Sequence, residues 1–127
     1  MAKAFSELSV AEIQAGLVAK EFSAQEIAKN SFERIAATDS SVHAYLETTE
    51  NLALEAAARV DAAIAAGDLS QAGPLAGVPV AFKDNMNLKG THTTCSSHML
   101  ENYISPYTTT CVSRIIEAGG IPLGKLN

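Results

Sequence analysis

A short apolar run that ends in a lysine is the feature that most constrains how this chain can fold. Residues 78–82 read VPVAF, and their length and β-branched content are typical of a buried strand. The preceding GPLAG indicates a turn, because glycine readily adopts positive φ and proline fixes φ at about −65°. Lys83 and Asp84 follow the run directly. Since lysine is rarely buried unless it is paired, Lys83 is the first candidate for a functional residue.

Two helix starts with the same chemistry lie upstream of this strand. Ser9 and Glu12 fit the capping box S-x-x-E, in which each side chain satisfies a free backbone N–H, and Ser23 and Glu26 repeat the pattern. Apolar residues recur at helical spacing behind each box, which predicts amphipathic helices of about 11 and about 15 residues. A longer helix is predicted over residues 50–66.

The order of the remaining elements indicates the fold class. Residues 42–47 alternate weakly and predict a strand, residues 85–97 predict a loop of functional length, and residues 110–118 predict a helix. Residues 121–126 predict another strand. Strand, long connection, helix and strand form a crossover unit, so we expect an α/β fold in which N-terminal helices precede a mixed, largely parallel sheet.

The length and net charge of the chain limit the classes of function that it can have. The chain has 127 residues, a net charge of −5 and a pI near 5.1, which argue for one domain at most and against non-specific nucleic-acid binding through a basic surface. An acidic subunit can still meet RNA through a partner. There is neither an apolar run of membrane-spanning length nor an apolar signal core, so we expect a cytoplasmic protein in which Cys95 and Cys111 stay reduced.

The chain stops at or just after its last predicted strand, whereas a sheet covered on both faces needs further elements. We therefore expect residues 1–127 to be the N-terminal portion of a single larger domain, helical over residues 1–40 and entering its α/β core over residues 41–127. A complete small α/β domain is the alternative. We also expect residues 121–127 to form an exposed sheet edge that promotes self-association.

The segment GGIPLGK fits the phosphate-binding pattern G-x-x-x-x-G-K but fails its other requirements. Leu126 stands where a Ser or Thr is needed to bind magnesium, and Pro122 removes a backbone donor. The predicted order is helix then strand, the reverse of a phosphate loop. We expect no nucleotide site here.

Four residues could be read as soft metal ligands: His92, Cys95, His98 and Cys111. Their alternating spacing lacks the second close pair that structural zinc sites use. We favour the alternative of polar loop residues and a buried helical thiol at Cys111, since free cysteine often packs as a small hydrophobe. A nucleophilic Cys95 is a further alternative, since histidines lie nearby in sequence. We favour neither a metal site nor a thiol nucleophile.

The pattern alone leaves several roles open for Lys83. It could be a solvated strand end, an ion-pair partner of Asp84 or a catalytic group.

The segment GPLAGVPVAFKDNMNLKGTHTTCSSHMLENYISPY, with the final AGGIPLGKLN, resembles the amidase signature family. The likeness runs from the N-terminal helices to the last residue, and TTCSSHMLENY is most similar to the transamidase branch of the family. The most specific elements are G-P-L-x-G-x-P, Lys83-Asp84, Thr93-Thr94-Cys95 and G-K-x-N. Departures occur at residues 108–110, where the family usually has Asp-Ala-Thr, at His98 in place of a lysine, and at Leu126 in place of a threonine.

The resemblance implies a catalytic Ser–cis-Ser–Lys set in which Lys83 is the lysine. The two serines belong to a Gly/Ser-rich segment that this family carries beyond the position of Asn127. The adjacent Ser96 and Ser97 lack the flanking glycines and lie too close to Lys83 in the chain to replace it. We therefore expect the isolated chain to be inactive.

The implied chemistry explains why a lysine would be placed on a buried strand. A lysine must be neutral to act as a base, whereas the pKa of a free lysine is about 10.4 and burial lowers it. Neutral Lys83 would take a proton from the bridging serine, which relays it from the nucleophilic serine. Consecutive strand residues point to opposite faces, so we expect Asp84 to serve the following turn rather than to pair with Lys83.

The same resemblance implies a glutaminase subunit that supplies ammonia for the amidation of glutamyl-tRNA(Gln) during protein synthesis. The implied partners are a B subunit, which uses ATP and Mg²⁺ and handles the tRNA, and a small C subunit; this chain itself would bind glutamine and no cofactor. One alternative is a stand-alone amidase of the same family. The other is a non-catalytic chain, either a truncated paralogue or a fragment that retains only a subunit-binding surface.

Overall fold

The last strand of the chain is the centre of a mixed sheet. In the computed structural model, which describes residues 3–127, β3 (Ile121–Leu126) pairs in antiparallel fashion with β1 (Tyr45–Thr48) and in parallel with β2 (Pro79–Lys83). The parallel pair is joined through α5 (Thr110–Glu117), as a crossover unit requires. The expected α/β class and mixed sheet are confirmed.

The prediction of an exposed edge at residues 121–127 is wrong. β3 has neighbours on both sides, and the outer strands of this sheet are β1 and β2. The pattern of β3 could not reveal this, because the identity of a strand's neighbours is set by distant segments.

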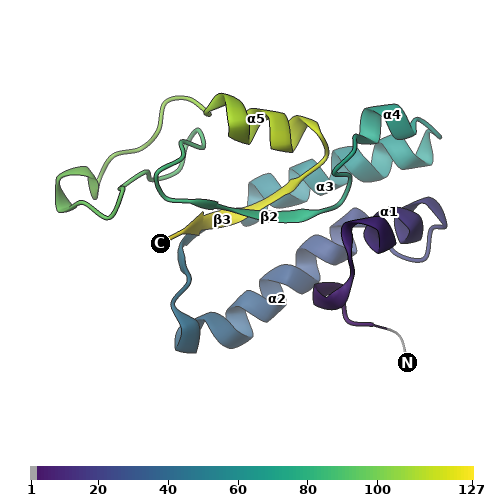
Figure 1. The fold of residues 1–127 in the computed structure, drawn as a ribbon, viewed down its shortest axis with the longest axis horizontal. Coiled ribbons are helices and arrows are strands. Elements are labelled where there is room, and N and C mark those ends of the chain that lie inside the picture. The colour runs from purple at the N-terminus through teal and green to yellow at the C-terminus, as the bar shows by residue number, and fades with distance from the viewer. Residues whose placement is uncertain (1–2) are drawn as a thin grey trace.

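Helices lie on both sides of the sheet, with α5 on one side and α2 (Ala24–Val42) on the other (Figure 1). The remaining helical elements are η1 (Phe5–Glu7), α1 (Val10–Val18), α3 (Glu50–Ala65), α4 (Leu69–Ala72) and η2 (His98–Leu100). α2 packs along α3, and α3 packs on β3. The predicted helices are confirmed, although α2, with 19 residues, is longer than expected.

Both predicted capping boxes are present. Ser9 Oγ accepts from the Glu12 amide at 3.2 Å, and Ser23 Oγ accepts from the Glu26 amide at 3.1 Å. The α2 start has an additional cap from another helix, because the Asp61 carboxylate of α3 accepts from the first two amides of α2 at 2.7 and 3.1 Å. This contact fixes the start of α2 against α3.

The predicted strand over residues 42–47 begins later than expected. Val42 is still helical, and His43 ends α2 in a left-handed conformation with φ of 55°. The Asp39 carboxylate then accepts from the Ala44 amide at 2.8 Å, which holds the chain in the turn before β1. A weak alternating pattern cannot detect such a side-chain cap.

Apolar side chains form two clusters. The larger buried set lies between the first four α-helices and the sheet: Ile13, Leu17, Ala24, Ile27, Ala28, Ala53, Ala57, Val60, Ala72, Ala76, Ile121 and Leu123. The smaller buried set, on the α5 side, comprises Phe82, Leu88 and Val112. The sheet therefore has two different apolar faces.

A bulge in β3 decides which face its last residues take. Two steps along β3, from Pro122 to Gly124, correspond to a single step along β2, so Leu123 is an extra residue. Leu123 packs in the larger cluster, whereas Lys125 pairs with Phe82 and shares the α5-side face with it. In a regular strand, residues two apart lie on the same face, so without the bulge Lys125 would share the face of Leu123.

Candidate active site at the carboxyl ends of β2 and β3

The parallel strands β2 and β3 end side by side, and the chain after β2 folds back over their carboxyl ends. Residues at this position are favourably placed for function, because ligands of α/β sheets bind at the carboxyl ends of parallel strands. Lys83 is the last residue of β2, and Lys125 lies one residue before the end of β3. Two lysines therefore stand at this end of the sheet, in different environments.

Lys83 is exposed, so the expectation that its strand buries it is wrong for residues 3–127. Within β2 only Phe82 is fully buried, since β2 is an outer strand of this sheet. The backbone of Lys83 is nevertheless held, because its neighbours Phe82 and Asp84 are 2% and 3% exposed. Alternation places the Lys83 side chain on the face opposite to those two residues.

Asp84 connects the loop after β2 to both strands. Its amide donates to the Leu126 carbonyl at 2.7 Å, and its carbonyl accepts from the Cys95 amide at 3.1 Å. Its carboxylate accepts from the Thr94 amide at 3.1 Å and from the Thr94 hydroxyl. We expected Asp84 to serve the turn directly after β2, but among residues 3–127 its carboxylate instead binds Thr94, ten residues further along the loop.

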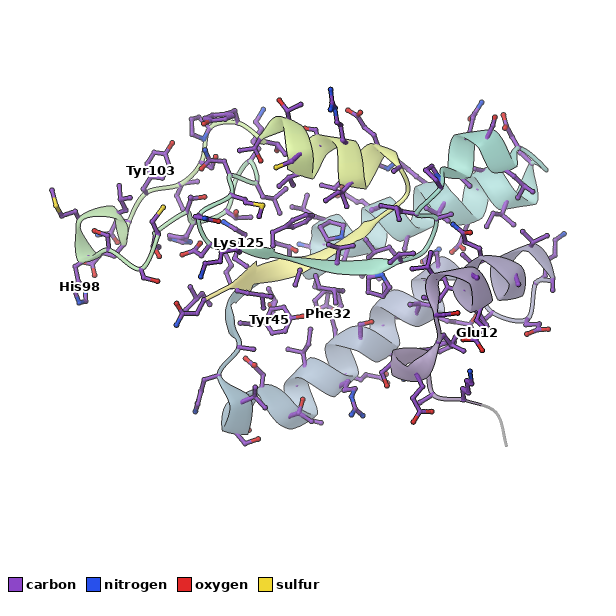
Figure 2. The ribbon with its side chains drawn as sticks, viewed as in Figure 1. Glu12, Phe32, Tyr45, His98, Tyr103 and Lys125 are labelled. Carbon is purple, nitrogen blue, oxygen red and sulfur yellow. The ribbon has the colours of Figure 1, made fainter. Side chains whose placement is uncertain are left out.

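The buried lysine of this site is Lys125 (Figure 2), whose side chain is 0% exposed. Its ammonium group donates to Asp84 Oδ1 at 3.2 Å, to the His92 carbonyl at 2.7 Å and to Thr93 Oγ1 at 3.2 Å. A lysine ammonium has three donors, so each has an acceptor. This arrangement offsets the high cost of removing an ammonium from water.

The pKa of Asp84 lies below its usual range. Burial alone would raise this pKa, but the hydrogen bonds from the Thr94 side chain and from Lys125, together with the Thr94 amide and the charge of Lys125, outweigh burial and lower it. Asp84 is therefore held as a carboxylate, which is the form that compensates the buried ammonium.

The sequence predicts no site role for Lys125, which falls in the family-like element G-K-x-N and in the rejected GGIPLGK pattern. The order predicted there, helix then strand, is confirmed by α5 and β3. The sequence feature that could have marked Lys125 is its position in the apolar segment IPLGKL, because a lysine that is buried there needs a partner. That signal could not name Asp84, which is 41 residues away in sequence.

The other candidate residues of the loop have structural roles or face solvent. The Glu47 carboxylate accepts from the His92 amide at 2.8 Å and lies 3.2 Å from His92 Nδ1, which ties the loop to β1. Cys95 is exposed and has a left-handed backbone with φ of 49°. His98 lies on the outer end of the loop (Figure 2), with its side chain fully exposed.

Cys111 is exposed at the start of α5, so the interpretation of a buried helical thiol is wrong. Within residues 3–127 there is no group of three or more His, Cys, Asp or Glu side chains that could hold a metal ion. The Ser96 hydroxyl donates to Asn127 Oδ1 at 2.9 Å and so joins the loop to the end of β3.

None of the helices over residues 3–127 is both long and apolar enough to span a membrane.

Two curated proteins that resemble this chain carry the same name. The chain is 51% identical over 120 residues to the A subunit of the glutamyl-tRNA(Gln) amidotransferase of Carboxydothermus hydrogenoformans, a match that covers 94% of this chain and 24% of the relative. The same-named protein of Nostoc punctiforme is 45% identical over 119 residues, again 94% of this chain and 24% of the relative. The chain thus spans about a quarter of the length of these relatives.

Solved structures and a family model agree with this similarity. The peptide amidase of Stenotrophomonas maltophilia superposes with a TM-score of 0.87 at 32% identity, covering 97% of this chain and 25% of that one. A bacterial aryl acylamidase of the amidase signature family superposes with a TM-score of 0.85 at 25% identity, covering 94% and 25%. The family model described as Amidase matches residues 26–127. The chain therefore belongs to the amidase family.

Proposed function

We propose that residues 1–127 form the N-terminal part of the glutamine-hydrolysing subunit of a glutamyl-tRNA(Gln) amidotransferase. The observation that carries this proposal is the 51% identity to a relative of that name across 94% of the chain. In this proposal the chain is the start of one amidase domain, with helices over residues 1–40 and the beginning of the core over residues 41–127. The complete cytoplasmic protein would work with a B subunit that uses ATP and Mg²⁺ and handles tRNA, and with a C subunit.

Lys83 is proposed as the general base of this reaction. A nucleophilic serine, supplied by a part of the protein outside these residues, attacks the side-chain amide carbon of glutamine. Its proton passes through a bridging serine to Lys83, and a proton returned to the leaving nitrogen releases ammonia and leaves an acyl-enzyme. Water then hydrolyses the acyl-enzyme to glutamate and regenerates the serine.

The position of Lys83 supports this role. Its side chain is exposed at the carboxyl end of a parallel strand, while Phe82 and Asp84 on either side are buried. An amine on a fixed backbone can be covered by a further layer of protein without rearrangement of β2. We propose that the additional length that the relatives possess supplies this cover, and with it the removal of water that a lysine base needs.

The test uses the complete protein that carries this segment, assembled with its partner subunits. Lys83→Ala should abolish ammonia release from glutamine while circular dichroism and the thermal midpoint stay close to those of wild type. Lys89→Ala, at an exposed lysine of the following loop, is the matched control and should retain activity. A folded Lys83→Ala protein with a near-wild-type rate would remove Lys83 from the mechanism.

A stand-alone amidase is the second candidate, favoured by the similarity to the peptide amidase at 32% identity. Ammonia release from glutamine and from peptide amides should be measured side by side. Preference for glutamine, with stimulation by the partner subunits and glutamyl-tRNA, supports the amidotransferase. Preference for peptide amides without such stimulation supports the stand-alone enzyme.

A non-catalytic role applies to the 127-residue chain by itself. The described residues place no serine in hydrogen-bond contact with Lys83, so we expect the purified chain to release no ammonia from glutamine. Lys83-dependent ammonia release by the pure chain would contradict this expectation.

A further inference from the structure

We propose that Lys125 is a positioning residue for Lys83: through its ion pair with Asp84 it holds the end of β2 so that the Lys83 amine meets the reacting groups. This inference rests on the proposed role of Lys83 as the general base. Lys125 itself does not touch substrate in this proposal, because its ammonium is 0% exposed and all its donors are occupied.

The contacts of Lys125 join three segments at one point. Asp84 directly follows β2, His92 and Thr93 belong to the loop, and Lys125 belongs to β3. Lys83 lies in the chain between buried Phe82 and Asp84, which is the member of this cluster that Lys125 pairs with. The backbone direction of Lys83 is therefore fixed on its carboxyl side by the Asp84–Lys125 pair.

The geometry of β3 is adapted to deliver Lys125 to this cluster. The extra residue Leu123 turns Lys125 away from the larger apolar cluster and toward Asp84. Gly124 permits the close approach of β1, because a Cβ atom there would overlap the Glu47 carbonyl oxygen. β-Bulges are over-represented next to active sites, where they redirect a side chain.

Burial also distinguishes this pair from an ordinary stabilising contact. Hydrophobic residues of similar volume often stabilise a fold at least as well as a buried ion pair does. A pair that sits directly beside the proposed base, and that also holds the loop over the strand ends, has a second use as a positional constraint. Displacement of a reacting group by about 1 Å can cost on the order of a hundredfold in rate.

The experiment compares Lys125→Met and the double variant Lys125→Met/Asp84→Asn with wild type in the complete protein. The double variant carries no isolated buried charge, so it separates folding from positioning. For each folded variant we expect kcat for glutamine hydrolysis to fall on the order of tenfold or more while KM changes by less than about twofold. This result is expected because misplacement of Lys83 weakens an interaction that is made only in the transition state. Lys89→Met is the control and should keep both constants.

Each outcome decides the inference. A folded double variant with wild-type kcat, or one in which only KM rises, overturns the positioning role. If neither variant folds, Thr93→Val decides, because it removes one acceptor of Lys125 while keeping the side-chain shape: a lower kcat supports the role and an unchanged kcat overturns it. Loss of activity in Lys83→Ala together with normal kcat in the Lys125 variants would reject this inference alone, whereas an active Lys83→Ala would reject the proposed function.

Discussion

Lys125 and Asp84 form an ion pair whose side chains are 0% and 4% exposed, with Nζ 3.2 Å from Oδ1. Surface pairs of this kind contribute little to stability because water and salt screen them. A buried pair behaves differently, since each charge depends on the other for compensation. Both the stability and the pH response of this end of the sheet should therefore depend on these two residues.

Acid should destabilise the fold through Asp84. The pKa of Asp84 in the folded chain lies below its usual value of about 4, because hydrogen bonds from Thr94 and Lys125 outweigh burial. A carboxyl group with a lowered folded pKa contributes stability above its unfolded pKa, and this contribution is lost as the pH falls through the folded pKa. Urea midpoints measured between about pH 6 and pH 2 should fall more steeply for wild type than for Asp84→Asn. Parallel curves for the two proteins would contradict this assignment.

Removal of the buried ammonium should be strongly destabilising. Lys125→Met leaves the Asp84 carboxylate without its charge partner and should lower the free energy of unfolding by about 3–5 kcal/mol. Lys125→Met/Asp84→Asn removes both charges and should recover part of this loss. Lys89→Met, at an exposed position, should change stability by less than about 0.5 kcal/mol in urea denaturation. A double variant that is no more stable than Lys125→Met would show that the uncompensated carboxylate is not the cause.

Loss of the α2 cap should weaken the helical layer. Ser23→Ala removes the acceptor for the Glu26 amide and should cost about 1 kcal/mol of unfolding free energy. Ser40→Ala, at an exposed position within the last turn of the same helix, is the control and should be neutral or slightly stabilising because alanine favours helix. Equal losses in both variants would indicate that the hydroxyl of Ser23 does not act as a cap.

The turn between α5 and β3 should accept only glycine at residue 119. Gly119 has φ of 97°, and a Cβ there would overlap the Ala72 carbonyl oxygen and lie 2.7 Å from Ala76 Cα. Gly119→Ala should therefore destabilise by more than about 2 kcal/mol, through backbone strain and displacement of this segment. Gly67→Ala is the control for strain alone, because Gly67 has φ of 75° with nothing within 4 Å of its Cβ position. Urea denaturation that ranks Gly67→Ala as the more damaging change would contradict the steric explanation.

Local sequence patterns were sufficient to predict most of the helices and strands. The capping boxes at Ser9 and Ser23 predicted two helix starts, because they depend on residues three positions apart. The segment 121–126, which follows the Gly119-Gly120 end of the last predicted helix, predicted β3 with the bounds that the structure has. The motifs around Lys83 were sufficient to predict the family, since they share a specific order of residues with it.

Burial and pairing required the tertiary structure. The sequence by itself determined that Lys83 ends a strand and that Asp84 points away from it, because alternation is a property of the strand. Only the tertiary structure decided that β2 is an outer strand which leaves Lys83 exposed, and that β3 lies at the centre. Only the tertiary structure brought Lys125 to Asp84, since this contact depends on a bulge and a parallel register between segments 41 residues apart. Interactions across such distances are set by the packing of the whole sheet, which no local pattern records.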